Sequence, residues 1–434
     1  MVLTFIAAPS PDLAARVDAL EARLAAAQHT AAFVDNTYLF LIMGMVVMFM
    51  SAGFCMLETG LVRQKNAATI ALKNVALYAL AGLAFYVVGY ELMYDGVDGG
   101  FFGHVRLWHP SPSVHAAYSS SAAWYFQMVF VATAASVVSG TLAERIKLWP
   151  FLLFSIMLCA FIYPVSGAWV WGGGWLARLH FSDFAGSTLV HSVGGWAALS
   201  GALFLGARRG KYPGGKAVSP MPGSNLPLAA LGTFILWFGW FGFNGGSQLA
   251  AGTIADIDAV ARIFVNTNAA AASGLVMALV LTTLIYGKAD LTLVLNGAIG
   301  GLVSITAGPL APVFWQAMVI GAMGGVIVVL AVPLLDRLKI DDVVGAIPAH
   351  LLCGIWGTLV VAWTERAGGF GFGRQLAVQA LGVFAVGIFV FGASSLVWFV
   401  LKATVGIRCG PEEEFTGLDL AELGLEAYPE FAQG

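Results

Sequence analysis

The sequence predicts an all-α integral membrane protein with eleven transmembrane helices. Of its 434 residues, 59% are hydrophobic and only 10% are charged, whereas a soluble domain carries about 25% charged residues. The apolar residues gather in eleven runs, and each run approaches the ~20 residues that a helix needs to cross the hydrocarbon core of a bilayer. No soluble fold can bury this much apolar surface, so lipid must surround most of the chain.

The expected spans follow one another with short connections. In chain order they cover 38–60, 70–93, 121–143, 150–170, 187–206, 227–246, 262–286, 291–308, 313–334, 345–363 and 377–402. Residues 11–29 precede the first span and predict a short polar helix. The 53 glycines suit helices that pack closely in a bilayer, where small residues let two backbones approach.

Basic residues predict the orientation, because the cytoplasmic loops of membrane proteins are enriched in Lys and Arg. One set of alternate connections carries Arg63, Lys65, Arg145, Lys147, Arg208, Arg209, Lys211, Lys216, Lys288, Arg337 and Lys339. The other set is poorer and carries Arg106, Arg178, Arg262, Arg366 and Arg374. We therefore expect an extracytoplasmic N-terminal segment over 1–37, a membrane domain over 38–404 and a cytoplasmic regulatory tail over 405–434.

Spans 5 and 10 begin with the same pattern. Span 5 opens with Asp183 and reaches His191 after seven intervening residues, and span 10 repeats this spacing with Asp342 and His350. At about 1.5 Å rise per residue, each histidine lies roughly 12 Å along its helix. If spans 1–5 and 6–10 are related halves, each half has five spans. Because five is odd, the two halves insert into the membrane upside down relative to each other, as is typical of transporters. Both histidines then reach the middle of the membrane from opposite faces.

His191 and His350 are the only ionisable residues that we expect deep within the spans. An ionisable group at this depth is costly and marks a functional site by default. The alternative is two unrelated histidines, each bonded to a neighbouring helix, but the matched spacing favours a pair. Two facing neutral imidazoles would offer donors and acceptors to a small solute. An aspartate at each entrance suits a helix N-terminus, where it caps free N–H groups.

Aromatic residues form the second notable group. They lie in FQMVF, which ends at Phe130, in WGGG, which begins at Trp171, and in WFGFNGGS, which contains Phe243 and ends at Ser247. Aromatic faces attract cations by about 0.5–2 kcal/mol, and tryptophan does so best. A tryptophan near the outer surface also fits the interfacial aromatic belt, so both interpretations remain open at this point.

Several classes of function are not favoured. The net charge of −3 does not suggest a nucleic-acid partner. The four cysteines, Cys55, Cys159, Cys353 and Cys409, show no metal-ligand spacing, and we expect no cofactor or metal. An enzyme using Asp183 and His191 is disfavoured, because roughly 12 Å along one helix separates them, too far for a catalytic pair.

A family resemblance covers residues from about 38 to 434. The stretches FQMVF, GTLAERIKLWPF, WVWGGGWLA, DFAGSTLVHSVGG, GWFGFNGGS, FVNT and DDVVGAIPAHLLCGIWGT, in this order, closely resemble the Amt/Mep/Rh ammonium transporter superfamily, specifically its bacterial Amt branch. GLVRQKNAA after the first span and the tail EEEFTGLDLAELGLEAYPEF are also similar to this family. Residues 1–37 lie outside the resemblance.

The resemblance implies a homotrimer in the cytoplasmic membrane, with one pore per subunit and two inverted repeats. It implies roles for the residues already singled out. Trp171, Phe130 and Ser247 would recruit ammonium; Phe130 and Phe243 would close the pore as a stacked pair; His191, His350 and Thr306 would lie along it; and Asp183 and Asp342 would hold the vestibules. This sequence departs from the family pattern at Leu57 and Glu58, where many relatives have Phe-Tyr, and at Gly345, where some relatives have an aspartate.

The expected function is transport of ammonium or ammonia, electrogenic by resemblance. The recruited ion would lose its proton, and ammonia would pass the histidines. Two alternatives stay open: a sensor that acts through a separate partner, and a passive Rh-type gas channel, against which the recruitment residues argue. From Leu418 to Leu425 the acidic tail has the leucine pattern L-x-L-x-x-L-x-L, which predicts packing under the subunit or a neighbour rather than a solvated acidic tail. The resemblance adds PII signal-transduction proteins as partners there.

Overall fold

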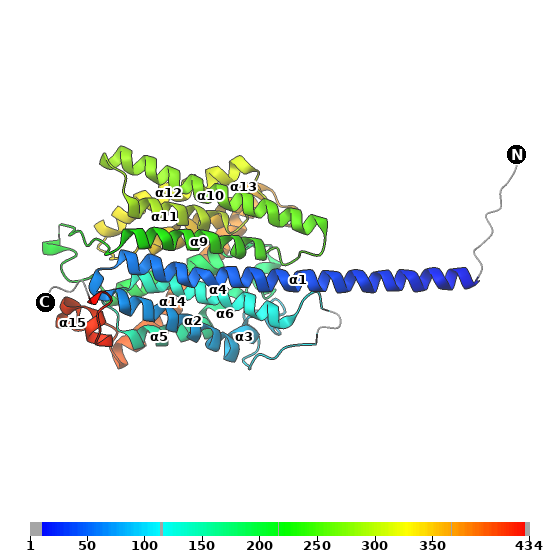
Figure 1. Cartoon of the computed structure of the whole chain (residues 1–434), viewed down its shortest axis with the longest axis horizontal. Coiled ribbons are helices and arrows are strands. Elements are labelled where there is room, and N and C mark those ends of the chain that lie inside the picture. The colour runs from blue at the N-terminus through cyan, green and yellow to red at the C-terminus, as the bar shows by residue number, and fades with distance from the viewer. Residues whose placement is uncertain (1–10, 113–115, 216, 366, 430–434) are drawn as a thin grey trace.

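The chain folds into a bundle of helices from which one long helix projects (Figure 1). The computed structural model describes residues 11–112, 116–215, 217–365 and 367–429. Within these residues, ten helical segments are long and apolar enough to cross a membrane, and α11 (Leu291–Ile305) is a shorter apolar helix that supplies the eleventh. The prediction of an all-α membrane protein is confirmed.

The helices follow the order of the predicted spans. The remaining bounds are α1 (Pro11–Leu61), η1 (Gln64–Asn66), α2 (Ala67–Ala84), η2 (Phe85–Gly89), α3 (Tyr90–Tyr94), α4 (Ser120–Thr141), α5 (Leu148–Met157), η3 (Leu158–Ile162), α6 (Tyr163–Ala168), α7 (Trp175–Arg178), η4 (Ser187–Ser192), α8 (Val193–Leu205), η5 (Pro213–Gly215), α9 (Leu226–Gly246), α10 (Ile254–Tyr286), α12 (Phe314–Arg337), η6 (Ile347–Leu352), α13 (Cys353–Thr364), η7 (Ala367–Gly369), α14 (Phe372–Thr404), α15 (Pro411–Thr416) and η8 (Asp419–Leu423).

The first span differs from the prediction. Residues 11–29 are helical as expected, but they do not form a separate short helix, because α1 runs unbroken from Pro11 to Leu61. The sequence explains the continuity, since no glycine or proline occurs between Asp12 and Met43 to interrupt the helix. Residues 1–10 lie outside the described residues.

Close packing of α1 on α9 depends on glycines. A Cβ on Gly60 would come within 2.5 Å of the Ala229 nitrogen, and a Cβ on Gly232 within 2.3 Å of the Leu57 nitrogen. These contacts leave no room for a side chain on either helix. They are the small-residue contacts that the glycine-rich composition predicts for helices packed in a bilayer.

Spans 5 and 10 run antiparallel, as the inverted halves require. The loop that follows α8 meets the loop that precedes η6, where Arg208 Nε lies 2.9 Å from Asp341 Oδ2. At the opposite end of the bundle, the Ser182 N–H before η4 donates to Gln379 Oε1 at 2.9 Å. The Gln379 amide donates in turn to the Thr358 carbonyl of α13 at 3.0 Å.

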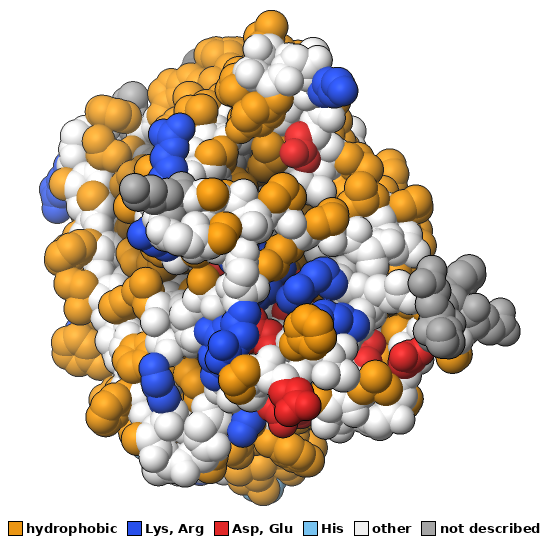
Figure 2. Space-filling view, turned by 90° about the vertical axis from the view of Figure 1, so that its left-hand side faces the viewer, with side chains coloured by type: hydrophobic (Ala, Val, Ile, Leu, Met, Phe, Trp, Pro, Cys, Tyr) orange, Lys and Arg blue, Asp and Glu red, His pale blue; other side chains and the backbone are white. Residues whose placement is uncertain are grey.

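The basic connections and the tail lie at the same end of the bundle, opposite the projecting end of α1, and we call it the cytoplasmic end (Figure 1). Figure 2 looks onto it and shows Lys and Arg side chains gathered around Asp and Glu. Arg208 also contacts Glu144 at 3.2 Å. Burial alone would raise the pKa of Asp341. The hydrogen bond from Arg208 and the charges of Arg145 and Arg208 outweigh burial and hold this pKa well below its usual range.

The tail packs against its own subunit. The Asp419 carboxylate accepts hydrogen bonds from the Ala68 and Thr69 N–H groups at 3.0 and 2.7 Å, at the start of α2. Glu414 is buried and lies 2.7 Å from Arg408. Leu418 is also buried. The predicted packing under the subunit is present at Glu414, Leu418 and Asp419, whereas Leu420 and Leu425 of the leucine pattern are exposed. Residues 430–434 lie outside the described residues.

Candidate functional site

Two buried histidines meet at the centre of the bundle. His191 lies in η4 and His350 in η6, and their Nδ1 atoms are 3.2 Å apart. Both segments are π-helical turns, which occur frequently at functional sites. Because one hydrogen bond joins the two nitrogens, one Nδ1 carries a proton and donates it to the bond, and the other Nδ1 accepts the hydrogen bond through its lone pair. The predicted direct contact between the two histidines is therefore present.

Aromatic rings surround the histidine pair. The His191 ring stacks on Trp240 with centroids 4.9 Å apart, and it lies 5.2 Å from Phe243. Phe54 lies 5.9 Å from the His350 ring. His191 Nε2 is buried without a hydrogen-bond partner among the described residues. A buried polar atom without a partner needs an explanation, and a polar solute beside this nitrogen would supply one.

Thr306 contacts Trp240, the ring on which His191 stacks. Its Oγ1 accepts a hydrogen bond from Trp240 Nε1 at 2.9 Å and donates to the Leu302 carbonyl at 2.7 Å. Thr306 thereby orients the indole on which His191 stacks. Its predicted place along a pore stays a prediction.

Phe130 and Phe243 stack face to face. Their ring centroids are 4.0 Å apart and their planes differ by 19°. Phe130 also contacts Trp171, with centroids 6.1 Å apart, while Phe243 contacts His191. The rings therefore form one continuous row from Trp171 through the stacked phenylalanines to the histidine pair.

Trp171 begins this row, and Ser247 contacts the backbone of Phe243. The Trp171 Nε1 donates to the Asp183 carbonyl at 2.9 Å, which fixes the indole. Ser247 directly follows α9, and its hydroxyl donates to the Phe243 carbonyl at 2.8 Å. The proton of this hydroxyl is thus engaged, and its lone pairs remain able to accept hydrogen bonds from a solute.

Asp183 holds the start of span 5. Its two carboxylate oxygens accept hydrogen bonds from four backbone N–H groups at 2.9 to 3.0 Å, those of Gly186, Ser187, Thr188 and Leu189. These are the donors that a helix N-terminus leaves without partners. Burial raises the pKa of Asp183 to about 6, while the four backbone hydrogen bonds oppose this rise.

Asp342 has the matching position in span 10 with a weaker set of bonds. It accepts from the Ile347 N–H at 2.7 Å and from the Thr141 hydroxyl at 3.0 Å. Burial raises the pKa of Asp342, while these two hydrogen bonds and one from the Ala346 backbone oppose the rise. The two aspartates are therefore equivalent in place but unequal in the number of backbone donors shown.

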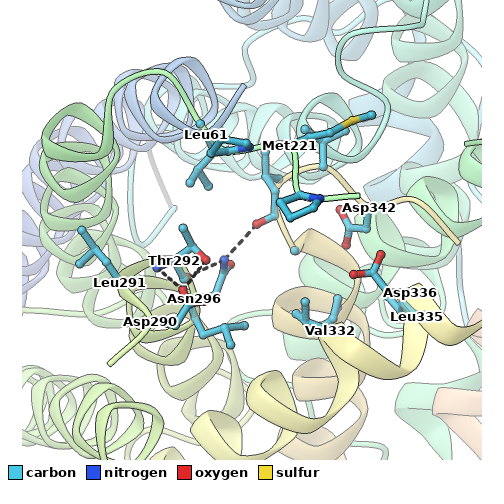
Figure 3. Close-up of a pocket in the computed structure, with 18 of the residues that line it drawn as sticks. Leu61, Met221, Asp290, Leu291, Thr292, Asn296, Val332, Leu335, Asp336 and Asp342 are labelled. Carbon is cyan, nitrogen blue, oxygen red and sulfur yellow. Dashed lines mark hydrogen bonds between the residues drawn. The ribbon is translucent and has the colours of Figure 1, made fainter. Parts of the chain in front are cut away.

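A cavity of about 650 Å³ opens at the cytoplasmic end of span 10 (Figure 3). Pro348, two residues before His350, lines it together with Asp342 and Asn296. The Asn296 amide donates to the Val344 carbonyl at 3.0 Å and to the Thr292 carbonyl at 3.1 Å. Sequence reasoning missed Asn296, although a lone asparagine inside an apolar run is a signal of function.

A second buried polar cluster was also missed. Glu58 Oε2 accepts hydrogen bonds from Asn74 at 2.9 Å and from the Ser139 hydroxyl at 2.7 Å. Lys73 of α2 is buried and donates to the Ser139 carbonyl at 3.0 Å. The expectation that the two histidines are the only ionisable residues within the spans is therefore wrong. Lys73 is accommodated because a backbone carbonyl and the Phe151 ring, 4.6 Å from its Nζ, replace water.

Known proteins share this architecture and sequence. The sequence model of the Ammonium Transporter Family matches residues 38–428. Ammonium transporter Amt2 of Archaeoglobus fulgidus is 42% identical, over 90% of this chain and 87% of that protein. A putative ammonium transporter of Synechocystis sp. is 40% identical, over 90% of this chain and 88% of that protein.

Solved structures agree with these relatives. A structure named "Sensor Amt Protein" superposes with a TM-score of 0.86 and 36% identity, and covers 90% of this chain and 98% of that chain. The crystal structure of Candida albicans Mep2 superposes with a TM-score of 0.80 and 28% identity, and covers 92% of this chain and 91% of that chain. The likeness thus spans nearly all of the bundle.

Proposed function

This chain belongs to the ammonium transporter family, and from this premise we propose how its residues move ammonium across the cell membrane. Ammonium is caught by cation–π attraction to Trp171 and Phe130 and by a hydrogen bond to Ser247. The ion gives up its proton to water at or below this site. Ammonia then passes the Phe130 and Phe243 rings and follows the nitrogens of His191 and His350 toward the cytoplasm.

The continuous row of rings from Trp171 to the histidine pair supports this mechanism best. An ammonium ion entering a dry apolar passage with its charge loses hydration that is worth many kcal/mol. Neutral ammonia avoids most of this cost, and the unpartnered His191 Nε2 offers it a hydrogen bond. The cavity lined by Asn296 and Asp342 suits release into water at the cytoplasmic end.

Net transport of charge distinguishes this mechanism from a gas channel. We propose that the proton crosses by a separate route, which makes uptake electrogenic. An ammonium concentration step applied to proteoliposomes should give an inward current. Alkalinisation of the lumen with no current would support the passive gas channel instead.

Sensing is the second candidate function. The solved structure with a TM-score of 0.86 is named as a sensor protein, and the folded tail offers a surface through which this chain could act on a partner. Transport currents comparable to those of relatives would favour the transporter. Ammonium-dependent partner binding with no current would favour the sensor.

We also propose a homotrimer, and PII-type proteins as partners at the cytoplasmic end. The family resemblance supports the trimer. The cytoplasmic end presents Lys, Arg, Asp and Glu side chains (Figure 2), and Arg209 is among its exposed residues. This charged face supports a partner with acidic and basic groups of its own. Size measurement in detergent tests the first proposal, and co-purification with a PII protein tests the second.

Replacement of Trp171 by alanine should weaken ammonium selection more than replacement of Trp175. Trp171 contacts Phe130 and is fixed by the Asp183 carbonyl, whereas Trp175 contacts Trp169 with centroids 5.7 Å apart. Loss of about 0.5–2 kcal/mol of cation–π attraction corresponds to roughly 2- to 30-fold weaker binding. Half-saturation of the ammonium current measures both variants, and equal effects would favour a shared role in the interfacial belt.

Deletion of the tail after Gly406 should lower or deregulate transport. The deletion removes Asp419 from the start of α2 and Glu422 from the Leu148 N–H at the start of α5, so two helix ends lose their caps. Asp419→Asn is the matched control, because it keeps the tail and removes the charge. Unchanged ammonium uptake by truncated protein that remains trimeric would contradict a regulatory role.

A further inference from the structure

The outer part of α1 stands apart from the bundle. Every residue from Asp12 to Ala31 is exposed, and the helix first meets the rest of the chain near Ala32 and Asn36. This arm projects from the bundle (Figure 1). At about 1.5 Å rise per residue, its exposed residues span roughly 30 Å. A single helix of this length is marginal in water without packing of one face.

One face of the arm carries an apolar stripe with coiled-coil spacing. Its members are separated by alternating steps of three and four residues: Val17, Leu20, Leu24, Ala27, Ala31 and Val34. In a heptad, Val17, Leu24 and Ala31 take position a, and Leu20, Ala27 and Val34 take position d. Leu20 and Leu24 are 64% and 59% exposed. A leucine stripe of this kind in water normally packs against another helix.

Charges flank the stripe in complementary positions. Arg16 and Arg23 take position g on one side, and Glu21 and Gln28 take position e on the other. Residues five apart do not face each other on one helix, so Arg16 and Glu21 do not pair within the arm. In two parallel helices, however, a g residue meets the e residue five positions on in its neighbour. Arg16 then pairs with Glu21, and Arg23 with Gln28.

The membrane itself sets the parallel direction. All copies of this chain insert in the same orientation, so their arms point the same way. The stripe also continues on α1 into the membrane through Tyr38, Leu41, Met45 and Met48, all of them exposed on the subunit. Lipid can cover the inner part, but the arm lies beyond the bundle, where lipid cannot cover it.

We propose that the arms of neighbouring copies of this chain wind together as a parallel coiled coil over Val17–Val34, outside the membrane. The coil joins the subunits at the outer end of the assembly, independently of their contacts within the bilayer. This inference rests on the proposed homotrimer, which supplies the neighbouring copies. A coil at this place would hold the assembly together without entering the transport path.

Disulfide trapping in the full-length protein tests the coil. Leu20→Cys places a thiol at position d, and Ala22→Cys, two residues away at position f, is the matched control. The native cysteines are buried and give little background. Oxidation in membranes should yield several-fold more covalent dimer of this chain from Leu20→Cys. Equal yields, no dimer, or a product with a different protein would overturn the proposal.

Charge reversal adds a second test. Arg16→Glu and Glu21→Arg should each lower the yield of Leu20→Cys dimer, and the double variant should restore it. The size of the unmodified protein in mild detergent is measured in parallel. A trimer whose arms do not cross-link contradicts the coil alone, whereas a monomer contradicts the proposed trimer. Deletion of residues 2–30 should leave ammonium uptake unchanged and lower the temperature at which the oligomer dissociates.

Discussion

Replacement of His350 by aspartate should make the pathway conduct potassium. His350 is buried and hydrogen-bonded to His191. The rings of Phe54, Trp240 and Phe243 surround the two histidines. A carboxylate in such a place is a fixed negative charge that compensates an entering cation. The wild-type imidazoles supply no such charge, so a whole cation meets the full desolvation cost there. We therefore expect a potassium current that the wild-type protein lacks.

His350→Asn is the matched control, since asparagine has nearly the shape of aspartate and no charge. It should give no potassium current. His350→Ala should reduce ammonium transport, because ammonia loses one of the two imidazoles that offer it a hydrogen bond. A hydrogen bond of about 0.5–1.5 kcal/mol corresponds to roughly 2- to 13-fold in rate. Currents of purified variants in liposomes measure all three. A potassium current in His350→Asn, or none in His350→Asp, would contradict the charge argument.

The histidine pair was predictable because the spacing of residues within each span is enough to predict it. Asp183 and Asp342 mark the starts of two spans, and the same number of residues leads from each to its histidine. Helical rise then fixes the depth, and the odd number of spans fixes the opposed directions. No contact between distant segments had to be known.

The stacked pair and the cavity were not predictable in this way. Phe130 lies in α4 and Phe243 in α9, so only the tertiary arrangement brings their rings to 4.0 Å. Sequence reasoning reached this pair through family resemblance alone. Asn296 and Lys73 were missed because hydropathy averages over a window, and one polar residue in an apolar run hardly changes it. Their partners come from other helices, which no local pattern shows.

The length of α1 was misjudged for a related reason. Hydropathy locates the segment that is apolar enough to lie in lipid, and it predicts the first span over 38–60, within α1. It says nothing about whether a polar helix before the span is joined to it. The absence of a helix breaker between Asp12 and Met43 was the available signal.

Replacement of Asp183 by alanine should destabilise the protein far more than replacement of Asp342. The Asp183 carboxylate accepts four backbone hydrogen bonds, whereas Asp342 accepts from the backbone at Ile347 and Ala346, and once from a threonine hydroxyl. A hydrogen bond to a charged group contributes about 1.5–3 kcal/mol. Four of them approach the ~5–15 kcal/mol by which a whole domain is stable. Without these bonds the backbone at residue 183 would no longer be held in place, and its carbonyl is the group that orients Trp171.

Asp183→Asn keeps the shape and separates charge from packing. In the asparagine side chain only one oxygen remains to accept hydrogen bonds, and an NH₂ group replaces the other. The oxygen can accept from two of the four backbone N–H groups, while the NH₂ group would face the other two and cannot accept from them. We expect Asp342→Ala to fold and transport, Asp183→Asn to unfold at a clearly lower temperature, and Asp183→Ala to yield little folded protein. Thermal unfolding of the purified variants and their ammonium currents measure this order. If Asp183→Asn were as stable as Asp342→Ala, the four backbone bonds would not be what holds span 5 and, with it, His191 in place.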